Sequence, residues 1–419
     1  MEELLVKNLE PAGESVENIK STTHCHASII PAWYEKHMQP MMDFARKLNP
    51  NPFNQPSDIS DYISLHQNDY LRLGNHPEVV EARKNANEKV RNEAFLSSIF
   101  GNNSDECEQF RQNIKKCLNA GDVLLTTSGW AANVGLLEAI TPLFTPIYLD
   151  KHAHPSLFDG AKLSLGKRIV VNHNDTDDLI ERVKVNGPGI VVIDAVYSTD
   201  GAICELEQYL EICEEFDCVL ILDEAHSFGI FGNGGGLAVE RSLENRVHFR
   251  TVSLNKALGG HGGLIAGNNE MMKLVKASCR SVIFSSATSS VSAAGHNAAL
   301  DILVKDNQRA ERCLNNASIM REKFASANID TGNSQCQIIS IAFKNEQDSC
   351  TFYQKMRSKN ILTSVFLYPA TPKGTALVRF SVHSELKIEE INKTVESAAE
   401  TLSEMDLLNK TVVSNQLNS

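Results

Sequence analysis

Lys256 is the residue of this sequence whose setting most favours covalent chemistry. It follows the run Val252-Ser253-Leu254-Asn255 and precedes a loop with four glycines between positions 259 and 263. An amine confined at the end of a buried strand loses hydration, which lowers its pKa and lets it form an imine with an aldehyde near neutral pH. A solvated surface lysine is the commoner fate of a single lysine. The interpretation therefore depends on its neighbours.

Asp223 ends a second apolar run, residues 218–222, and opens the sequence Asp-Glu-Ala-His that finishes at His226. Open α/β sheets bind ligands at the carboxyl ends of their strands, where a carboxylate needs a cationic partner. An acid at this position also caps the next helix about as often. From these residues alone, both interpretations stay open.

Residues 127–133, Thr-Ser-Gly-Trp-Ala-Ala-Asn, follow one predicted strand and open a predicted helix. Backbone N–H groups and the dipole at such a helix start form an anion site suited to phosphate, and Gly129 permits close approach. His154 follows another strand end and could stack on a flat ring. An ordinary strand-to-helix turn and a loop histidine with satisfied hydrogen bonds are the alternatives.

The elements that must position these residues are short apolar runs alternating with helix-like segments, the pattern of a parallel sheet covered on both faces. The predicted strands are 123–125, 147–149, 169–172, 190–196, 219–222 and 247–252, followed by a helical stretch over 297–327 and strands 338–343 and 377–382 of a small α+β domain. We predict an N-terminal arm (1–60), a large domain (61–305), a small C-terminal domain (306–408) and a flexible tail (409–419).

Composition restricts the partners and the compartment. A net charge of -12 argues against nucleic acid or an anionic membrane. Ten scattered cysteines without a Cys-x-x-Cys pair, an acidic N-terminus and no apolar run near ~20 residues favour reduced thiols and a cytoplasmic protein. His24-Cys25-His26 and His152-x-His154 lack partners at zinc-site spacing, so we predict no structural metal.

In their order and spacing, six motifs resemble the α-oxoamine synthases, pyridoxal-phosphate enzymes that join an amino acid to an acyl thioester. The resemblance covers about residues 62–400 and implies an aspartate-aminotransferase-like fold of type I, with a mainly parallel seven-stranded sheet and a small C-terminal α+β domain. The motifs are Asn68-Asp69-Tyr70-Leu71, residues 128–133, His154-Pro155-Ser156-Leu157, Ser198-Thr199-Asp200-Gly201, Asp223-Glu224-Ala225-His226 and residues 253–256.

The resemblance implies a role for each matching residue. Lys256 carries the cofactor as a Schiff base, and Asp223 pairs with the pyridine nitrogen so that the ring acts as an electron sink. His154 stacks on the ring and joins these two as a catalytic residue. The remaining cofactor contacts are His226 and Ser198 near the phenolic oxygen, and Ser128, Gly129, Trp130 and Ser253 at the phosphate.

Two further segments complete the implied site. Ser286, in Phe284-Ser285-Ser286, reaches the phosphate from the neighbouring subunit, so the resemblance implies a homodimer with shared sites. Arg379, in Val378-Arg379-Phe380-Ser381, binds the amino-acid carboxylate with a planar guanidinium, and Asn68 lies nearby. A surface arginine and a turn asparagine are the ordinary alternatives.

The stretch 95–103 departs from most of the family because it lacks an arginine in a glycine-rich loop. This departure, Ser128-Gly129-Trp130 and residues 364–371 resemble the quorum-sensing synthases that make α-hydroxyketone precursors. The expected reaction joins an amino acid to a medium- or long-chain acyl-CoA with loss of carbon dioxide, giving an α-aminoketone. The alternatives are a housekeeping synthase of 8-amino-7-oxononanoate, 2-amino-3-ketobutyrate, 5-aminolevulinate or sphingoid type, another aminotransferase or lyase, and a cofactor-free scaffold subunit.

Overall fold

The computed structural model consists of two compact units, Met1–Asn51 and Pro52–Ser419, which are considered separately. The first contains helix α2 (Ala32–Lys47). The structure describes residues 31–47, 58–89, 96–100, 104–306, 308–368, 370–371 and 374–408. The predicted tail, the His24-Cys25-His26 motif and parts of the stretch 95–103 lie outside these residues.

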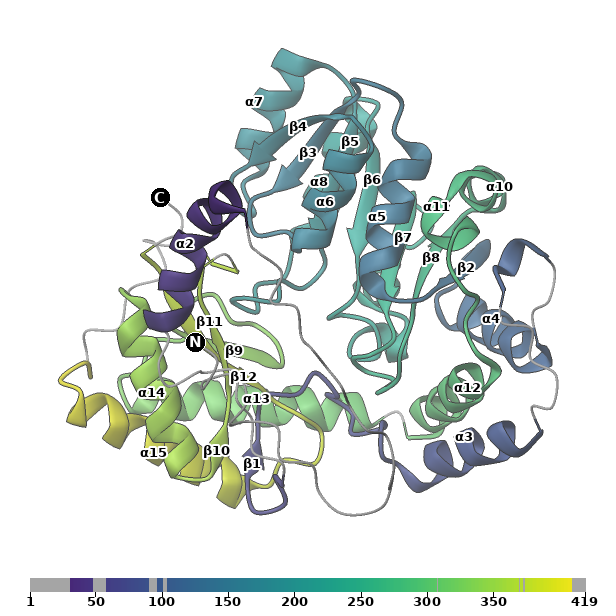
Figure 1. Cartoon of the computed structure of the whole chain (residues 1–419). Helices are drawn as coiled ribbons and strands as arrows, with labels where there is room; N and C mark the ends of the chain where they lie inside the picture. The colour runs from purple at the N-terminus through teal and green to yellow at the C-terminus, as the bar shows by residue number, and fades with distance from the viewer. Residues whose placement is uncertain are drawn as a thin grey trace. The chain divides into compact units, whose positions relative to one another are not determined.

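A seven-stranded sheet forms the centre of the second unit, with the strand order β2-β8-β7-β6-β5-β3-β4 (Figure 1). Strand β8 runs antiparallel to both neighbours, and the other adjacent pairs are parallel. The strands are β2 (Asp122–Thr126), β3 (Pro146–Asp150), β4 (Lys167–Val171), β5 (Ile190–Asp194), β6 (Val219–Asp223), β7 (Phe249–Ser253) and β8 (Gly263–Gly267). The predicted fold class is confirmed.

The sheet is covered on both faces because its strands alternate between two apolar clusters. In β5, Ile190 and Val192 join the cluster of α5 (Gly129–Ile140) and α6 (Pro155–Leu163). Val191 and Ile193 join the opposite cluster, which contains residues of α7 (Thr176–Asn186) and α8 (Leu206–Glu215). Burying each such side chain contributes ~1.5–3 kcal/mol. This packing holds the strand ends, and the polar residues that follow them, at one sheet edge.

A third helix group packs beside β2, β7 and β8. Helix α12 contacts both α3 and α4, and their buried residues share one cluster with Val123 and Val252 of the sheet. This group consists of α3 (Pro77–Lys89), α4 (Asp105–Cys117) and α12 (Ser290–Lys305). Helix α9 (Leu237–Glu240) joins the cluster of α7 and α8, and α10 (Asn269–Ser278) and α11 (Arg280–Ile283) join the cluster of α5 and α6. The 3-10 turns are Ser98–Phe100 and Gly232–Gly234.

A smaller antiparallel sheet, with the order β11-β12-β9, packs with the C-terminal helices around Phe324 and Phe380. Strand β1 (Ile63–Ser64) pairs with β10 (Ile361–Leu362), which places the residues after β1 beside the small sheet and its helices. Its other elements are α13 (Gln308–Ser326), β9 (Ile338–Phe343), α14 (Glu346–Ser358), β11 (Ser364–Phe366), β12 (Ala376–Ser381) and α15 (Ile388–Glu404). The proposed boundaries of the large and small domains remain predictions.

All six strands predicted for the large sheet are present, and β9 and β12 correspond to the two predicted later strands. Strand β8 was not predicted, because its glycine-rich sequence indicated a loop. The predicted helical stretch 297–327 is two helices, α12 and α13, with an interruption after Lys305. Within the described residues, no helix has the length and apolar character that crossing a membrane requires.

Gly201 is a testable point of strain, because its φ is 73° and an added Cβ would collide with the carbonyl oxygen of Ile338. Gly187 also has positive φ, 84°, but open space around the Cβ position. We expect Gly187→Ala to lower the free energy of unfolding by ~1–3 kcal/mol and Gly201→Ala to cost ~1–3 kcal/mol more. Urea unfolding measures both values, and equal losses would contradict the predicted collision.

Candidate active site

A pocket of about 350 Å³ opens where the carboxyl ends of the parallel strands meet the small sheet. Every predicted site residue except Ser286 lines it: Asn68, Ser128, Gly129, Trp130, His154, Ser198, Asp223, His226, Ser253, Lys256 and Arg379. Asn133, Asp194, Ala225, Asn255 and Phe366 complete the lining. Ser286 lies exposed in the segment before α12. The structure brings these residues together, and their individual roles remain predictions.

The amine of Lys256 is buried, with 9% of the residue exposed. Burial lowers its pKa, the carboxyl groups of Asp223 and Asp194 raise it, and Arg379 lowers it further, to a value of about 8. Its Nζ lies 2.9 Å from Nε2 of His226. A substantial fraction of this amine is therefore unprotonated near neutral pH, as attack on an aldehyde requires.

A chain of hydrogen bonds links Lys256 to the far side of the pocket. Nδ1 of His226 lies 2.7 Å from the hydroxyl of Tyr70, which donates to Oδ1 of Asn68 at 3.3 Å. Burial holds the pKa of His226 well below its usual value, and the nearby Lys256 lowers it further. Because the ring is neutral, one assignment satisfies every group: Lys256 donates to Nε2, and Nδ1 donates to Tyr70.

Asp223 caps a turn and lines the pocket. A turn over residues 225–230 follows it where the alternative interpretation expected a helix, and its role toward a cofactor remains a prediction. Its Oδ1 accepts from the N–H of Ala225 at 2.8 Å, and its Oδ2 accepts from Nδ2 of Asn133 at 2.6 Å. Asp194 is its partner on the adjacent strand, and burial, reinforced by Asp223, raises the pKa of Asp194 well above the usual value. Asp194 and Asp223 are thus two buried acids side by side on adjacent strands.

Asn133, Asp194 and Tyr70 are contacts to which sequence reasoning gave no role. Asn133 is buried in α5, among alanine, valine and leucine. Asp194 is the one polar residue of the predicted strand 190–196, and Tyr70 lies two residues after Asn68. A polar residue in an apolar helix or strand was the available signal, since such groups are buried only with partners.

The start of α5 forms an anion cradle against Ser253. The Ser128 hydroxyl caps the helix by accepting from the N–H of Ala131 at 3.1 Å. A Cβ at Gly129 would lie 2.7 Å from Cβ of Ser253, so only glycine allows this close approach. The first N–H groups of a helix have no partner within the helix and attract anions. The cradle is therefore suited to a phosphate.

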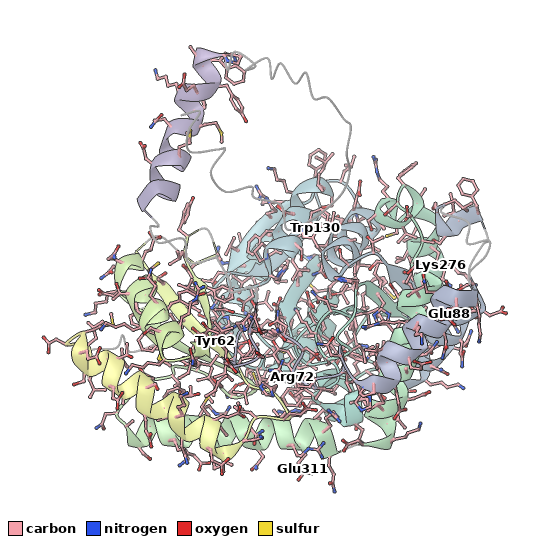
Figure 2. All side chains as sticks on the ribbon, turned by 60° about the horizontal axis from the view of Figure 1, so that its bottom comes forward. Tyr62, Arg72, Glu88, Trp130, Lys276 and Glu311 are labelled. Atoms are coloured by element: carbon pink, nitrogen blue, oxygen red, sulfur yellow. The ribbon has the colours of Figure 1, made fainter. Side chains whose placement is uncertain are left out.

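His154 and Trp130 form walls of the pocket. The backbone N–H of His154 donates to Asp194 Oδ1 at 3.2 Å, and its Nδ1 lies 2.7 Å from the Ser156 hydroxyl. Burial lowers the pKa of His154, although Asp223 raises it. Trp130, labelled in Figure 2, leaves half of its surface exposed. A neutral imidazole fixed at its backbone and at Nδ1 can present its face to a flat ring.

Arg379 is a buried cation held by neutral acceptors. Its two Nη atoms donate to the carbonyl oxygen of Ser198 at 2.8 Å and to Oδ1 of Asn68 at 2.9 Å. The guanidinium lies over the ring of Phe366, 4.7 Å from its centroid, and only 5% of Arg379 is exposed. Within the described parts of the chain, no carboxylate pairs with it. A buried charge requires compensation, so this site favours an anionic ligand.

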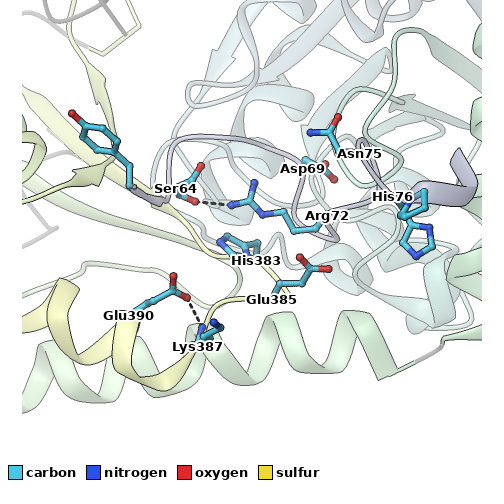
Figure 3. Close-up of a pocket in the computed structure, with 11 residues that line it drawn as sticks. Ser64, Asp69, Arg72, Asn75, His76, His383, Glu385, Lys387 and Glu390 are labelled. Carbon is cyan, nitrogen blue, oxygen red and sulfur yellow. Dashed lines mark hydrogen bonds between the residues drawn. The ribbon is translucent and has the colours of Figure 1, made fainter. Parts of the chain in front are cut away.

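A second pocket, of about 490 Å³, lies beside Arg72 and contains none of the predicted site residues (Figure 3). Arg72 donates to the Ser64 carbonyl oxygen, Lys387 donates its backbone N–H to Glu390, and Asp69 accepts from two backbone N–H groups. Arg72, Asp69 and Lys387 thus have hydrogen-bond partners within the chain. The first pocket is the better candidate for chemistry.

Comparison with known proteins assigns the family. Residues 60–397 match the family model described as aminotransferase class I and II. The chain is 29% identical over 346 residues to a CAI-1 autoinducer synthase of Vibrio campbellii, covering 82% of this chain and 88% of that protein. It is also 29% identical to an 8-amino-7-oxononanoate synthase of Alkaliphilus metalliredigens, covering 83% and 89%. A structure of SPT with the PLP internal aldimine has a TM-score of 0.84 at 21% identity, covering 89% and 99%.

The chain therefore belongs to the class I and II aminotransferase family and, within it, to the α-oxoamine synthases. These are acyltransferases that use pyridoxal phosphate, and the predicted family, enzyme class and cofactor are confirmed.

The residues present fit this cofactor. The pocket offers the buried amine of Lys256 for the aldehyde, the carboxylate of Asp223 for a ring nitrogen, and the glycine cradle of α5 for the phosphate. Its volume lies within the ~300–1,000 Å³ common for small-molecule sites.

The pKa of Lys256 gives a pH prediction. The unprotonated amine attacks the aldehyde, so imine formation by the cofactor-free protein should accelerate as pH rises through about 8 and then level off. Asp223→Asn removes a charge that raises this pKa and should move the midpoint down. Arg379→Gln removes a positive charge that lowers the pKa of Lys256, so it should move the midpoint up. Stopped-flow absorbance from about pH 6 to pH 10 measures the midpoints, and shifts of the same sign would contradict this assignment.

Proposed function

We propose that this enzyme condenses an amino acid with a medium- or long-chain acyl-CoA and releases an α-aminoketone, the precursor of an α-hydroxyketone signal. The observation that carries the amino-acid half of the proposal is Arg379, a buried cation in the same pocket as Lys256 and held only by neutral acceptors in the described structure. A substrate carboxylate would supply the missing negative charge.

The chain's own groups account for the order of events. Arg379 and Asn68 bind the substrate carboxylate and place its Cα near Lys256. The cofactor, when bound, withdraws electrons from Cα and makes its proton acidic. Lys256 Nζ, freed as an amine with a pKa of about 8, accepts that proton. The neutral His226 holds the amine in place by accepting a hydrogen bond from it at Nε2. The new C–C bond to the acyl carbon expels the CoA thiolate, which takes a proton from solvent. Loss of carbon dioxide leaves an electron pair at Cα, and the proton held by Lys256 returns there to give the aminoketone.

The signal-synthase branch is supported by two observations. One relative is a CAI-1 autoinducer synthase, and residues 95–103 lack the arginine that most of the family carries there. The identity to an 8-amino-7-oxononanoate synthase is equally high. A housekeeping synthase is therefore the second candidate, and the product separates the two.

The substrates are tested by incubating the holoenzyme with a series of acyl-CoA chains and amino acids, while measuring thiol release and product mass. We expect thiol release only when both substrates are present, and a product whose mass equals the acyl group plus the decarboxylated amino acid. Amino transfer without thiol release would contradict the proposed condensation. A product of pimeloyl chain length would favour the housekeeping synthase.

Arg379→Gln tests the carboxylate clamp. Loss of the charge-assisted hydrogen bonds should raise KM for the amino acid ~10–100-fold, corresponding to ~1.5–3 kcal/mol, with little change in KM for acyl-CoA. Arg72→Gln, in the second pocket, is the matched control and should change either KM less than about twofold. Steady-state kinetics with each substrate varied in turn measures both effects, and similar behaviour of the two variants would refute the clamp.

We also propose a cytoplasmic homodimer in which Ser286 of each chain completes the site of the other. The exposed position of Ser286, outside the pocket of its own chain, supports the shared site. Eight described cysteines, Cys107 not counted, are free thiols, which supports a reducing compartment.

Mixing two inactive variants tests the shared site. Lys256→Ala removes the amine, and Ser286→Trp blocks the phosphate approach. In a heterodimer, one of the two sites has both wild-type residues, so a statistical mixture should recover about a quarter of wild-type activity. Each variant refolded alone is the control. Absence of recovery, in a mixture that forms heterodimers by native mass spectrometry, would place Ser286 and Lys256 in the same chain's site.

A further inference from the structure

Three side chains that the proposed reaction does not use converge at the same sheet edge. His152 follows β3, His173 follows β4 and Asp200 follows β5, three strands adjacent in the sheet (Figure 1). One ligand atom from each lies within 4.8 Å of the other two. We propose that this cluster binds a divalent transition-metal ion, zinc foremost, although the sequence spacing predicted no structural metal.

The ligand atoms face one another without hydrogen-bond partners. Nδ1 of His152 and Nε2 of His173 are buried and make no hydrogen bond. They lie 3.7 Å and 3.3 Å from Oδ2 of Asp200, whereas a hydrogen bond between such charged groups is ~2.7–2.9 Å long. Tetrahedral zinc with bonds of ~2.0–2.2 Å separates its ligands by roughly 3.3–3.6 Å. The separation between His173 and Asp200 falls within that range and the one between His152 and Asp200 exceeds it slightly, so the three ligand atoms already lie near coordination distance.

Asp150, at the end of β3, fixes the tautomer that a metal requires. Its carboxylate accepts from Nδ1 of His173 at 3.0 Å, the N–H of His152 at 2.7 Å, the N–H of Asn174 at 2.8 Å and the Tyr197 hydroxyl at 2.9 Å. Acceptance from so many donors requires an ionised carboxylate, so Nδ1 of His173 carries the proton. Nε2 of His173 is then the ring nitrogen that faces the cluster, as in carboxylate-histidine-metal arrangements. Burial lowers the pKa of His173, but the carboxylates of Asp150 and Asp200 raise it to about 9, so an ion that binds here displaces a proton from this nitrogen.

The donor set selects the kind of ion. Two imidazole nitrogens and one carboxylate oxygen suit zinc and its neighbours rather than calcium or magnesium, and three protein ligands leave one position for water. The side chain of His173 is 2% exposed and that of His152 is 13% exposed. The two rings now lie stacked, with centroids 4.1 Å apart, so binding requires His152, the more exposed ring, to tilt out of the stack.

An ion here would fix the loop that orients the substrate clamp. The loop carrying Asp200 also carries Ser198, whose carbonyl oxygen accepts from Arg379. The adjacent Thr199 carbonyl oxygen accepts from Ser340 of the small sheet. A metal joining this loop to the ends of β3 and β4 would therefore stabilise the position of Arg379 without contacting the substrate.

Zinc titration of the untagged holoenzyme, depleted of metal by dialysis, tests the proposal. Isothermal titration calorimetry should give about one zinc per chain, and Co²⁺ added in place of zinc should give visible ligand-field absorption. His152→Gln, at the more exposed position, should weaken zinc binding at least tenfold and abolish the rise in melting temperature that zinc causes in the wild type. Asp200→Asn is a second ligand variant with the same expected loss.

The double variant His24→Gln, His26→Gln is the matched control, because these residues are a rival histidine pair in the sequence, and it should bind zinc like the wild type. Wild type that binds no zinc, or His152→Gln that binds it with unchanged affinity, would overturn the proposal. The cluster would then be a hydrogen-bonded imidazolium between two carboxylates.

Discussion

The site depends on one physical constraint, the burial of opposite charges at the carboxyl edge of a parallel sheet. Lys256 and Arg379 are cations with almost no contact with solvent, and Asp194 and Asp223 are acids on adjacent strands beneath them. Removing such charges from water costs several kcal/mol each unless partners compensate. Burial lowers the pKa of Lys256 and raises that of Asp194, which disfavours the charged form of each group. The charge of Arg379 has no carboxylate partner within the described residues and requires an anionic ligand.

The sheet explains why these groups can be held so closely. Parallel strands deliver their carboxyl ends to one edge, where polar residues follow apolar runs without interrupting them. Helix α5 brings Gly129 against Ser253 and turns Asn133 toward Asp223. The small sheet contributes Arg379 from β12, next to the segment that carries Asn68. Four separate parts of the chain therefore meet in one pocket.

Much of the fold and of the pocket could be predicted because strand ends, glycines and charged residues are recognisable in the local sequence. The six strands and the pocket residues from Ser128 to Lys256 follow from such signals, together with family resemblance. Strand β8 was missed because it begins at Gly263, inside the loop predicted from the glycines at 259–263, although pairing with β2 and β7 determines its conformation. The partners of Asn133 and the converging His152 cluster depend on side chains far apart in sequence, which spacing alone cannot relate.

The proposed chemistry requires that Lys256 is the amine that holds the cofactor. Borohydride reduction of the holoenzyme makes that link permanent, and peptide mass spectrometry then locates it. We predict the phosphopyridoxyl group on the peptide containing Lys256, with none on any other lysine and none in Lys256→Ala. Labelling of a different lysine, or equal labelling of the variant, would contradict the account.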